Sequence, residues 1–249
     1  MKKYDFVIPL KRNESAWNDC GELKLLLRSV EENFPVNRII ILSDSLPEWL
    51  DRDKIVWIET NDPFKHNKDA NLIRKILIAA QLKDITPTFY WSCDDHLIFR
   101  KPKNSELNPF FISDLHNEQS YWWSGTWKTG MKRTMDLLIS KNKSTYHYDA
   151  HIPQPINAAK FFELFNDLKL EENKRYCINT LYFNQAGLRK HNHIGILKAT
   201  FEKPVTELSQ IKTSCHNRLF VGYNNRGLTK ELQEFILNKF PKKSCYEII

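Results

Sequence analysis

Glycine-rich phosphate-binding motifs are missing from this 249-residue chain. None of its 7 glycines belongs to a G-x-G-x-x-G or G-K-S/T pattern, so neither a dinucleotide oxidoreductase nor a P-loop kinase is supported. There is also no G-x-S-x-G segment, which argues against an α/β hydrolase. The 5 cysteines are scattered without a C-x-x-C pair, which predicts reduced thiols rather than a disulfide framework or a zinc module.

Long apolar runs are also missing. No stretch approaches the roughly 20 apolar residues that cross a bilayer, and the apolar stretch near the start is too short for a signal peptide. We therefore expect a soluble, cytoplasmic protein. Its length and 41% hydrophobic content suit a single α/β domain over residues 1–249. The net charge of +7 predicts an anionic partner, such as a nucleotide diphosphate, an anionic polymer, a lipid head group or nucleic acid.

Hydrophobic periodicity predicts strands that alternate with helices in residues 1–100. Strands are expected at 3–10, 38–42, 55–58 and from 89 onward, and helices at 19–33 and 67–82. This order is typical of a mostly parallel sheet covered by helices. Residues 101–249 are less regular, with a strand or aromatic wall expected at 121–127 and helices at 157–168 and 229–240.

The aromatic run that begins at Phe89 ends in Asp94, Asp95 and His96. Open α/β sheets bind ligands at the carboxyl ends of their strands, and these donors suit Mn²⁺ or Mg²⁺ bridging a diphosphate. In an extended segment, Asp94 and His96 would point to one face as a metal pair, and Asp95 would point elsewhere, toward a sugar hydroxyl. If the backbone turns there, Asp95 is the ligand instead. A solvated polar strand end is the simpler interpretation of the same residues.

The segment 212–218 is a second candidate cluster. His216 is a candidate for a distant third metal ligand, and Lys212 and Arg218 are candidates for binding the departing diphosphate, whose negative charge needs cations. A solvated basic loop is an equally acceptable interpretation.

The loop at 146–155 contains two candidates for the general base. Either Asp149 or His151 would take the proton from an acceptor hydroxyl, and the sequence does not choose between them. Further candidates follow the first strands or lie on the second helix, where the edge of the sheet would hold a nucleotide. These are Pro9, Lys11, Arg12, Asp44, Asn71 and Lys75. The tryptophans Trp122, Trp123 and Trp127 would stack on a sugar or base, although such clusters more often form core.

Several segments resemble, in order and spacing, nucleotide-sugar glycosyltransferases of the GT-A fold. They are 7–10, 22–30, 39–44, 46–50 and 91–96. They are particularly similar to Stealth-type capsule sugar-phosphate transferases, which carry E-L-x-x-S-L-R-S, P-x-W-L and N-D-D segments. The resemblance implies a GT-A-like, Rossmann-like fold with a nucleotide-sugar-binding half at 1–100 and an acceptor half at 101–249. It also implies that 94–96 form the acidic metal motif and that His216 is a late third ligand.

Two departures from the Stealth pattern favour plain glycosyl transfer over sugar-phosphate transfer. Cys93 stands where that family has Asn, and the opening T-W-V-D-G is absent. We expect a metal-dependent hexosyl- or pentosyltransferase that uses Mn²⁺ or Mg²⁺ and a nucleotide diphosphate sugar. The acceptor would be a hydroxyl of a glycan, a lipid-linked precursor or a hydroxylated DNA base. The alternatives are a Stealth-like sugar-1-phosphate transferase and a non-catalytic basic module that binds nucleic acid.

Overall fold

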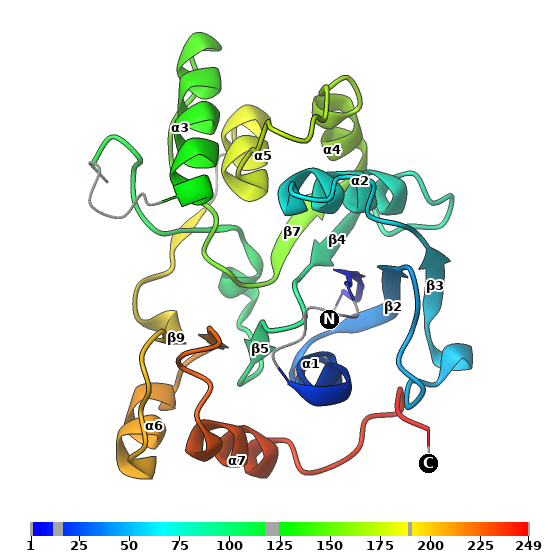
Figure 1. Cartoon of the computed structure of the whole chain (residues 1–249), viewed down its shortest axis with the longest axis vertical. Helices are drawn as coiled ribbons and strands as arrows, with labels where there is room; N and C mark the ends of the chain where they lie inside the picture. Colours follow the sequence, from blue (N-terminus) through cyan, green and yellow to red (C-terminus); the bar gives the residue numbers. More distant parts are fainter. Residues whose placement is uncertain (1, 12–16, 118–124, 189–190, 249) are drawn as a thin grey trace.

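A five-stranded central sheet organises the computed structural model, which describes residues 2–11, 17–117, 125–188 and 191–248. Its strands are β1 (Tyr4–Pro9), β2 (Val36–Ser43), β3 (Val56–Glu59), β4 (Thr88–Trp91) and β7 (Gln154–Asn157), in the order β3-β2-β1-β4-β7. All neighbours pair in parallel except β4 and β7, which are antiparallel. The predicted mostly parallel sheet flanked by helices is therefore confirmed (Figure 1).

Helices cover both faces of this sheet (Figure 1). Helix α1 (Gly21–Asn33) packs on one face, and α2 (Lys68–Ala80), α4 (Ala158–Phe165) and α5 (Ile178–Ala186) pack on the other. Within β2, Ile39 and Ile41 belong to the core on the α1 side, whereas Ile40 and Leu42 belong to the core on the α2 side. The unbroken apolar run of β2 follows from this burial on both faces.

A smaller sheet extends the core on the α1 side. Strands β5 (Leu97–Ile98), β10 (Phe220–Tyr223) and β9 (Lys198–Phe201) form it in that order, and β6 (Phe110–Phe111) pairs separately with β8 (Asn192–His193). Helices α6 (Leu208–Cys215) and α7 (Lys230–Lys239) add apolar side chains to the same core. Because β5 follows β4 closely, residues 92–96 connect the two sheets.

Four short 3₁₀ helices are found in the described residues, at Asn18–Cys20, Arg52–Lys54, Asn104–Leu107 and Gly195–Leu197. The helices expected at 157–168 and 229–240 are observed as α4 and α7, each somewhat shorter.

The strand expected at 121–127 is not observed in the part of this range that the structure describes. Residues 121–124, which include Trp122 and Trp123, lie outside the described residues, and Trp127 belongs to helix α3 (Gly125–Ser140). The buried residues Met131, Thr134 and Leu138 of α3 have helical spacing.

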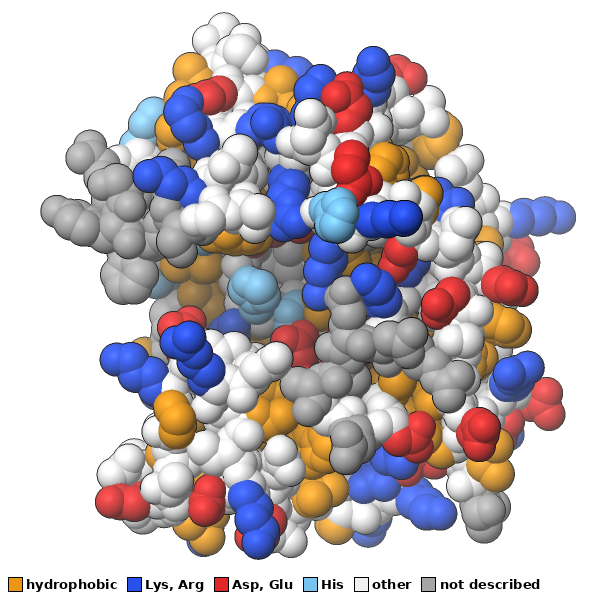
Figure 2. All heavy atoms as spheres, in the orientation of Figure 1, with side chains coloured by type: hydrophobic (Ala, Val, Ile, Leu, Met, Phe, Trp, Pro, Cys, Tyr) orange, Lys and Arg blue, Asp and Glu red, His pale blue; other side chains and the backbone are white. Residues whose placement is uncertain are grey.

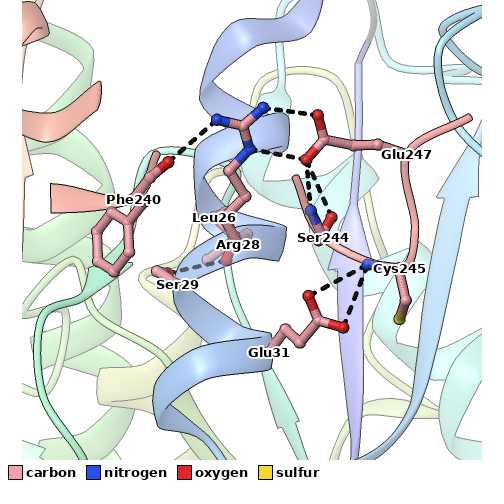
Figure 3. Close-up of polar contacts among 8 residues, drawn as sticks. All are labelled: Leu26, Arg28, Ser29, Glu31, Phe240, Ser244, Cys245 and Glu247. Atoms are coloured by element: carbon pink, nitrogen blue, oxygen red, sulfur yellow. Dashed lines mark hydrogen bonds and ion pairs between the residues drawn. The ribbon is translucent and has the colours of Figure 1, made fainter. Parts of the chain in front are cut away.

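The C-terminal tail is fastened to α1 by a buried ion pair (Figure 3). Arg28 donates from Nε and Nη2 to the two carboxylate oxygens of Glu247, each at 2.7 Å, and from Nη1 to the carbonyl of Phe240 at 3.0 Å. Glu247 also accepts the backbone N–H of Ser244 at 2.8 Å. This network fixes the residues that follow α7.

None of the described helices is long and apolar enough to cross a membrane. No disulfide joins any of the 5 cysteines, all of which lie within the described residues, as their scattered spacing predicts.

Candidate functional site

A cavity of about 520 Å³ opens at the carboxyl edge of the central sheet. It is lined by Pro9 and Lys11 at the end of β1 and by Trp91 at the end of β4. In the sheet, β2 and β3 lie on one side of β1, whereas β4 lies on its other side. Such a topological switch point is where open α/β sheets bind ligands. Figure 2 shows the hollow, with histidine side chains on its wall and basic side chains beside it.

The backbone turns at Asp94 and Asp95, directly before β5. The turn gathers one potential ligand atom from each of Cys93, Asp95 and His96, all within 4.8 Å of one another. Oδ1 of Asp95 lies 3.5 Å from Nε2 of His96. Asp94 lines the cavity but is not part of this group. The arrangement is therefore the turned one, in which Asp95 accompanies His96.

His96 is buried without a hydrogen-bond partner. Its side chain is 5% exposed, and neither ring nitrogen makes a hydrogen bond to the protein. Burial, more than any neighbouring charge, lowers the pKa of His96 to about 3, so the ring is neutral and keeps a lone pair. A neutral imidazole beside a carboxylate and a thiol suits a divalent transition metal.

Two further carboxyl groups at the cavity resist ionisation. Burial, followed by the charges of Asp95 and Glu22, raises the pKa of Asp94 to about 7. Burial, followed by the charge of Asp149, raises the pKa of Asp69 to about 6. Burial is the larger cause for both groups, and a cation bound nearby would favour their ionised forms.

Four of the expected nucleotide contacts, Pro9, Lys11, Asn71 and Lys75, line the cavity. Lys75 Nζ lies 2.8 Å from Asp62 and donates to the carbonyl of Leu10 at 3.0 Å. Asn71 donates to the carbonyl of Phe64 at 2.7 Å and accepts its N–H at 3.1 Å. Lys75 and Asn71 thus hold the loops that form the cavity wall.

Asp149 caps helix α5 from a distant part of the sequence. Its two carboxylate oxygens accept the backbone N–H groups of Asn179 at 3.3 Å and Thr180 at 3.1 Å. Negative charge at a helix N-terminus is stabilising, and the carboxylate satisfies two N–H groups of the first helical turn. Asp149 also lines the cavity.

His151 lies in the cavity wall with an unusual backbone conformation. Its φ of 48° is in the left-handed region, which is uncommon for residues other than glycine and often occurs at functional sites. The ring centre lies 6.0 Å from that of His96 and 6.2 Å from that of Trp127. Burial and the charge of Lys198 lower the pKa of His151, so its ring is neutral at pH 7.

The remaining predicted site residues that the structure describes do not line this cavity. Asp44 is exposed and accepts a hydrogen bond from Ser45. Lys212 is on α6, and His216 follows that helix as an exposed residue, 3.0 Å from the side-chain nitrogen of Asn217. Arg218 donates to backbone carbonyls nearby. Arg12 lies outside the described residues. The roles expected for these residues stay predictions.

The sequence-based reasoning missed several polar residues at or beside the site. Lys68 and Asp69 form the first turn of α2 and line the cavity, as does Arg175. Lys198 donates to the carbonyl of Ala150 at 2.7 Å, and burial lowers the pKa of Lys198 to about 8. A sequence signal for Lys68 and Asp69 was present: Asn67 is a typical N-cap residue, so the next two residues are expected in the first turn of the predicted helix.

Comparison with known proteins gives a fold but no family. No family model matches the chain, and no curated protein matches its sequence. The apo bifunctional glycosyltransferase WbbM is 11% identical over 96% of this chain and 52% of its own, with a TM-score of 0.50. The galactosyltransferase LgtC, solved with donor and acceptor sugar analogs, is 13% identical over 97% and 98% of the two chains, with a TM-score of 0.49. GlyE of Streptococcus pneumoniae TIGR4 is 9% identical over 98% and 61%, with a TM-score of 0.48. The likeness to WbbM and the mostly parallel sheet flanked by helices give the protein the predicted GT-A-like fold, and a relation to the Stealth-type transferases is not shown.

Proposed function

We propose that this protein is a glycosyltransferase that moves a sugar from a nucleotide diphosphate sugar to a hydroxyl acceptor, with a divalent cation at the turn that holds Asp95 and His96. One observation carries the proposal: the switch-point cavity contains a potential metal-ligand group that includes the neutral His96, whose ring nitrogens make no hydrogen bond to the protein. The cavity volume of about 520 Å³ lies within the range of small-molecule sites.

The basic side chains of the cavity suit the diphosphate of such a donor. Lys68 stands in the first turn of α2, where helical N–H groups and the helix dipole favour anions. Lys11 and Arg175 also line the cavity. As the bond between the sugar and the diphosphate breaks, negative charge develops on the departing oxygen, and these cations stabilise it. A bound cation adds Lewis-acid stabilisation of the same charge.

His151 is our candidate for the base, rather than Asp149. Both carboxylate oxygens of Asp149 are engaged with α5, whereas the neutral ring of His151 can accept a proton. In the proposed step, the acceptor oxygen bonds to the anomeric carbon and the bond to the diphosphate oxygen breaks with its electron pair. The acceptor proton passes to a ring nitrogen of His151.

The acceptor and the compartment are also part of this proposal. A net charge of +7 favours an anionic acceptor, either a glycan or lipid-linked precursor or a hydroxylated base in nucleic acid. Five cysteines without a disulfide fit a reducing compartment, and we propose the cytoplasm.

A panel of nucleotide sugars tests the function. Each donor is incubated with the protein and Mn²⁺, Mg²⁺ or no cation, and hydrolysis and transfer are followed by mass spectrometry. We expect one donor to turn over only with a cation, and the mass added to an acceptor to identify a hexose, a pentose or a sugar phosphate. Asp95→Asn should abolish the turnover, whereas Asp167→Asn, at an exposed aspartate of the loop after α4, should not. No binding and no turnover with any donor would rule the proposal out.

A further inference from the structure

We propose that Cys93 is a ligand of the cation site, together with Asp95 and His96, and that this thiol makes the site select zinc-class cations over Mg²⁺. The inference rests on the proposed function only in taking the turn as the cation site. It concerns which ion binds there and through which atoms.

The positions of the three side chains support a shared ion. Their potential ligand atoms lie within 4.8 Å of one another, and all three residues line the cavity. Ligand atoms arranged tetrahedrally around zinc, at bond lengths of about 2.0–2.3 Å, lie roughly 3.3–3.7 Å apart. Cys93 and Asp95 are both only partly buried, and small rotations of their side chains would bring the three ligand atoms to these distances.

His96 independently points to a ligand at this place. Its side chain is 5% exposed and neither ring nitrogen makes a hydrogen bond to the protein, although the carboxylate of Asp95 lies 3.5 Å from Nε2. Leaving a buried polar group unsatisfied costs about 1–3 kcal/mol, and such groups in a folded protein call for an explanation. A metal ion on one nitrogen would satisfy that atom.

The types of donor atom decide which ion is favoured. Mg²⁺ prefers six oxygen ligands in octahedral geometry, and this group offers one carboxylate, one imidazole and one thiol. Zn²⁺ accepts all three types, and three protein ligands leave a position open for a diphosphate oxygen. Binding displaces the thiol proton to solvent, because the thiolate is the ligand form.

Cobalt spectroscopy tests the ligand directly. Co²⁺ is added to the protein without nucleotide, and the near-ultraviolet absorbance is followed for a thiolate-to-cobalt charge-transfer band. We expect the band to saturate at one ion per chain, to disappear when Zn²⁺ is added, and to be lost in Cys93→Ser. The matched control is Cys245→Ser, because Cys245 is the exposed cysteine and lies in the C-terminal tail. This variant should keep the band.

Competition titrations give the size of the effect. We expect Cys93→Ser to weaken Zn²⁺ binding at least ten-fold and to leave Mg²⁺ binding unchanged within two-fold. Cys93→Asp should shift the preference toward Mn²⁺ and Mg²⁺ by at least ten-fold, because it replaces sulfur with a carboxylate. Thermal unfolding of each variant shows whether it is folded.

Alkylation of the unaltered protein tests the same assignment without a variant. Iodoacetamide modification is mapped by mass spectrometry, and saturating Zn²⁺ should protect Cys93 while Cys245 reacts at the same rate. The absence of the charge-transfer band at one bound Co²⁺ per chain, its survival in Cys93→Ser, or alkylation of Cys93 at an unchanged rate would each overturn the inference.

These outcomes separate the inference from the proposed function. If the band appears but no nucleotide sugar turns over, the transferase proposal fails and the thiol site stands. If a donor turns over with Mg²⁺ and no band forms with Co²⁺, the function stands and the role of Cys93 is refuted.

Discussion

Breaking the ion pair between Arg28 and Glu247 should destabilise the protein by several times the effect of breaking a surface pair. The Arg28 side chain is 12% exposed and that of Glu247 is 4% exposed, and two hydrogen bonds of 2.7 Å join them. Removing one member of a buried pair leaves the other charge without compensation, which typically costs about 3–5 kcal/mol. Because Arg28 keeps some contact with solvent, we expect Arg28→Met to lower the free energy of unfolding by about 3 kcal/mol.

The pair also predicts a pH dependence. Burial raises the pKa of Glu247, but hydrogen bonds from Arg28 and Ser244 outweigh this and hold it below the usual value of 4.5. The unfolded chain then binds the proton more readily than the folded one, so the stabilisation is present above about pH 4.5 and is lost as the pH falls through the folded-state pKa. In Arg28→Met, protonation of Glu247 should no longer lower the free energy of unfolding as the pH falls.

Urea unfolding followed by circular dichroism measures the effect. The variants Arg28→Met and Glu247→Gln and the double variant form a cycle whose coupling energy should be about 2 kcal/mol, within the range for residues in contact. The matched control is Lys132→Met, because Lys132 pairs with Asp136 on the surface with exposures of 63% and 54%. The control should cost about 0.5 kcal/mol or less. A loss below about 1 kcal/mol in Arg28→Met would contradict the reasoning, since this is the range of exposed pairs.

Two predictions concern the acidic residues of the cavity wall. Asp69 has a pKa raised from 3.8 to about 6, so the folded protein binds more protons than the unfolded chain between these values, and stability falls as the pH rises through that window. Asp69→Asn should remove about 3 kcal/mol of this pH dependence and stabilise the protein above pH 6. Urea unfolding from pH 4 to 8 measures the free energy of unfolding of both proteins. If this free energy changes with pH by the same amount in the variant and in the unaltered protein, the prediction is refuted. Asp149→Ala removes the cap of α5 and should cost about 1–2 kcal/mol, with faster hydrogen exchange at Asn179 and Thr180. Unchanged exchange at these two amides would show that Asp149 does not hold the helix.

The sequence predicts the central sheet because its signals are local. β2 has a continuous apolar run, and α1 and α2 each carry an apolar stripe at helical spacing, so each element can be identified without knowing its neighbours. Their strand-helix order then restricts the topology to a mostly parallel sheet.

The sequence does not show which residues form the potential metal-ligand group, because its geometry depends on one turn. Asp94 and His96 share a face only if the backbone is extended, and the observed turn at 94–95 gathers Cys93 with Asp95 instead. The sequence names these residues but does not show which of them face one another. Cys93 was noted only as a departure from a family pattern.

Most of the second half was not predictable from local patterns. Every residue of α5 from Ile178 to Gln185 is buried, including polar ones, so this helix has no exposed polar face that would reveal its period. Contacts that shape the cavity also join distant segments: Arg175 donates to the carbonyl of His66, and Asp149 caps a helix that begins at Ile178. Such partners emerge only when the chain is folded.

The most direct test of the central claim is calorimetric titration of the protein with a panel of nucleoside diphosphates, with and without Mn²⁺ or Zn²⁺. We predict that one nucleoside diphosphate binds once per chain, that removing the cation weakens binding at least ten-fold, and that Asp95→Asn has the same effect. Binding that is insensitive to both the cation and Asp95, or no binding by any member of the panel, would contradict the account of the switch-point cavity as a cation-assisted donor site.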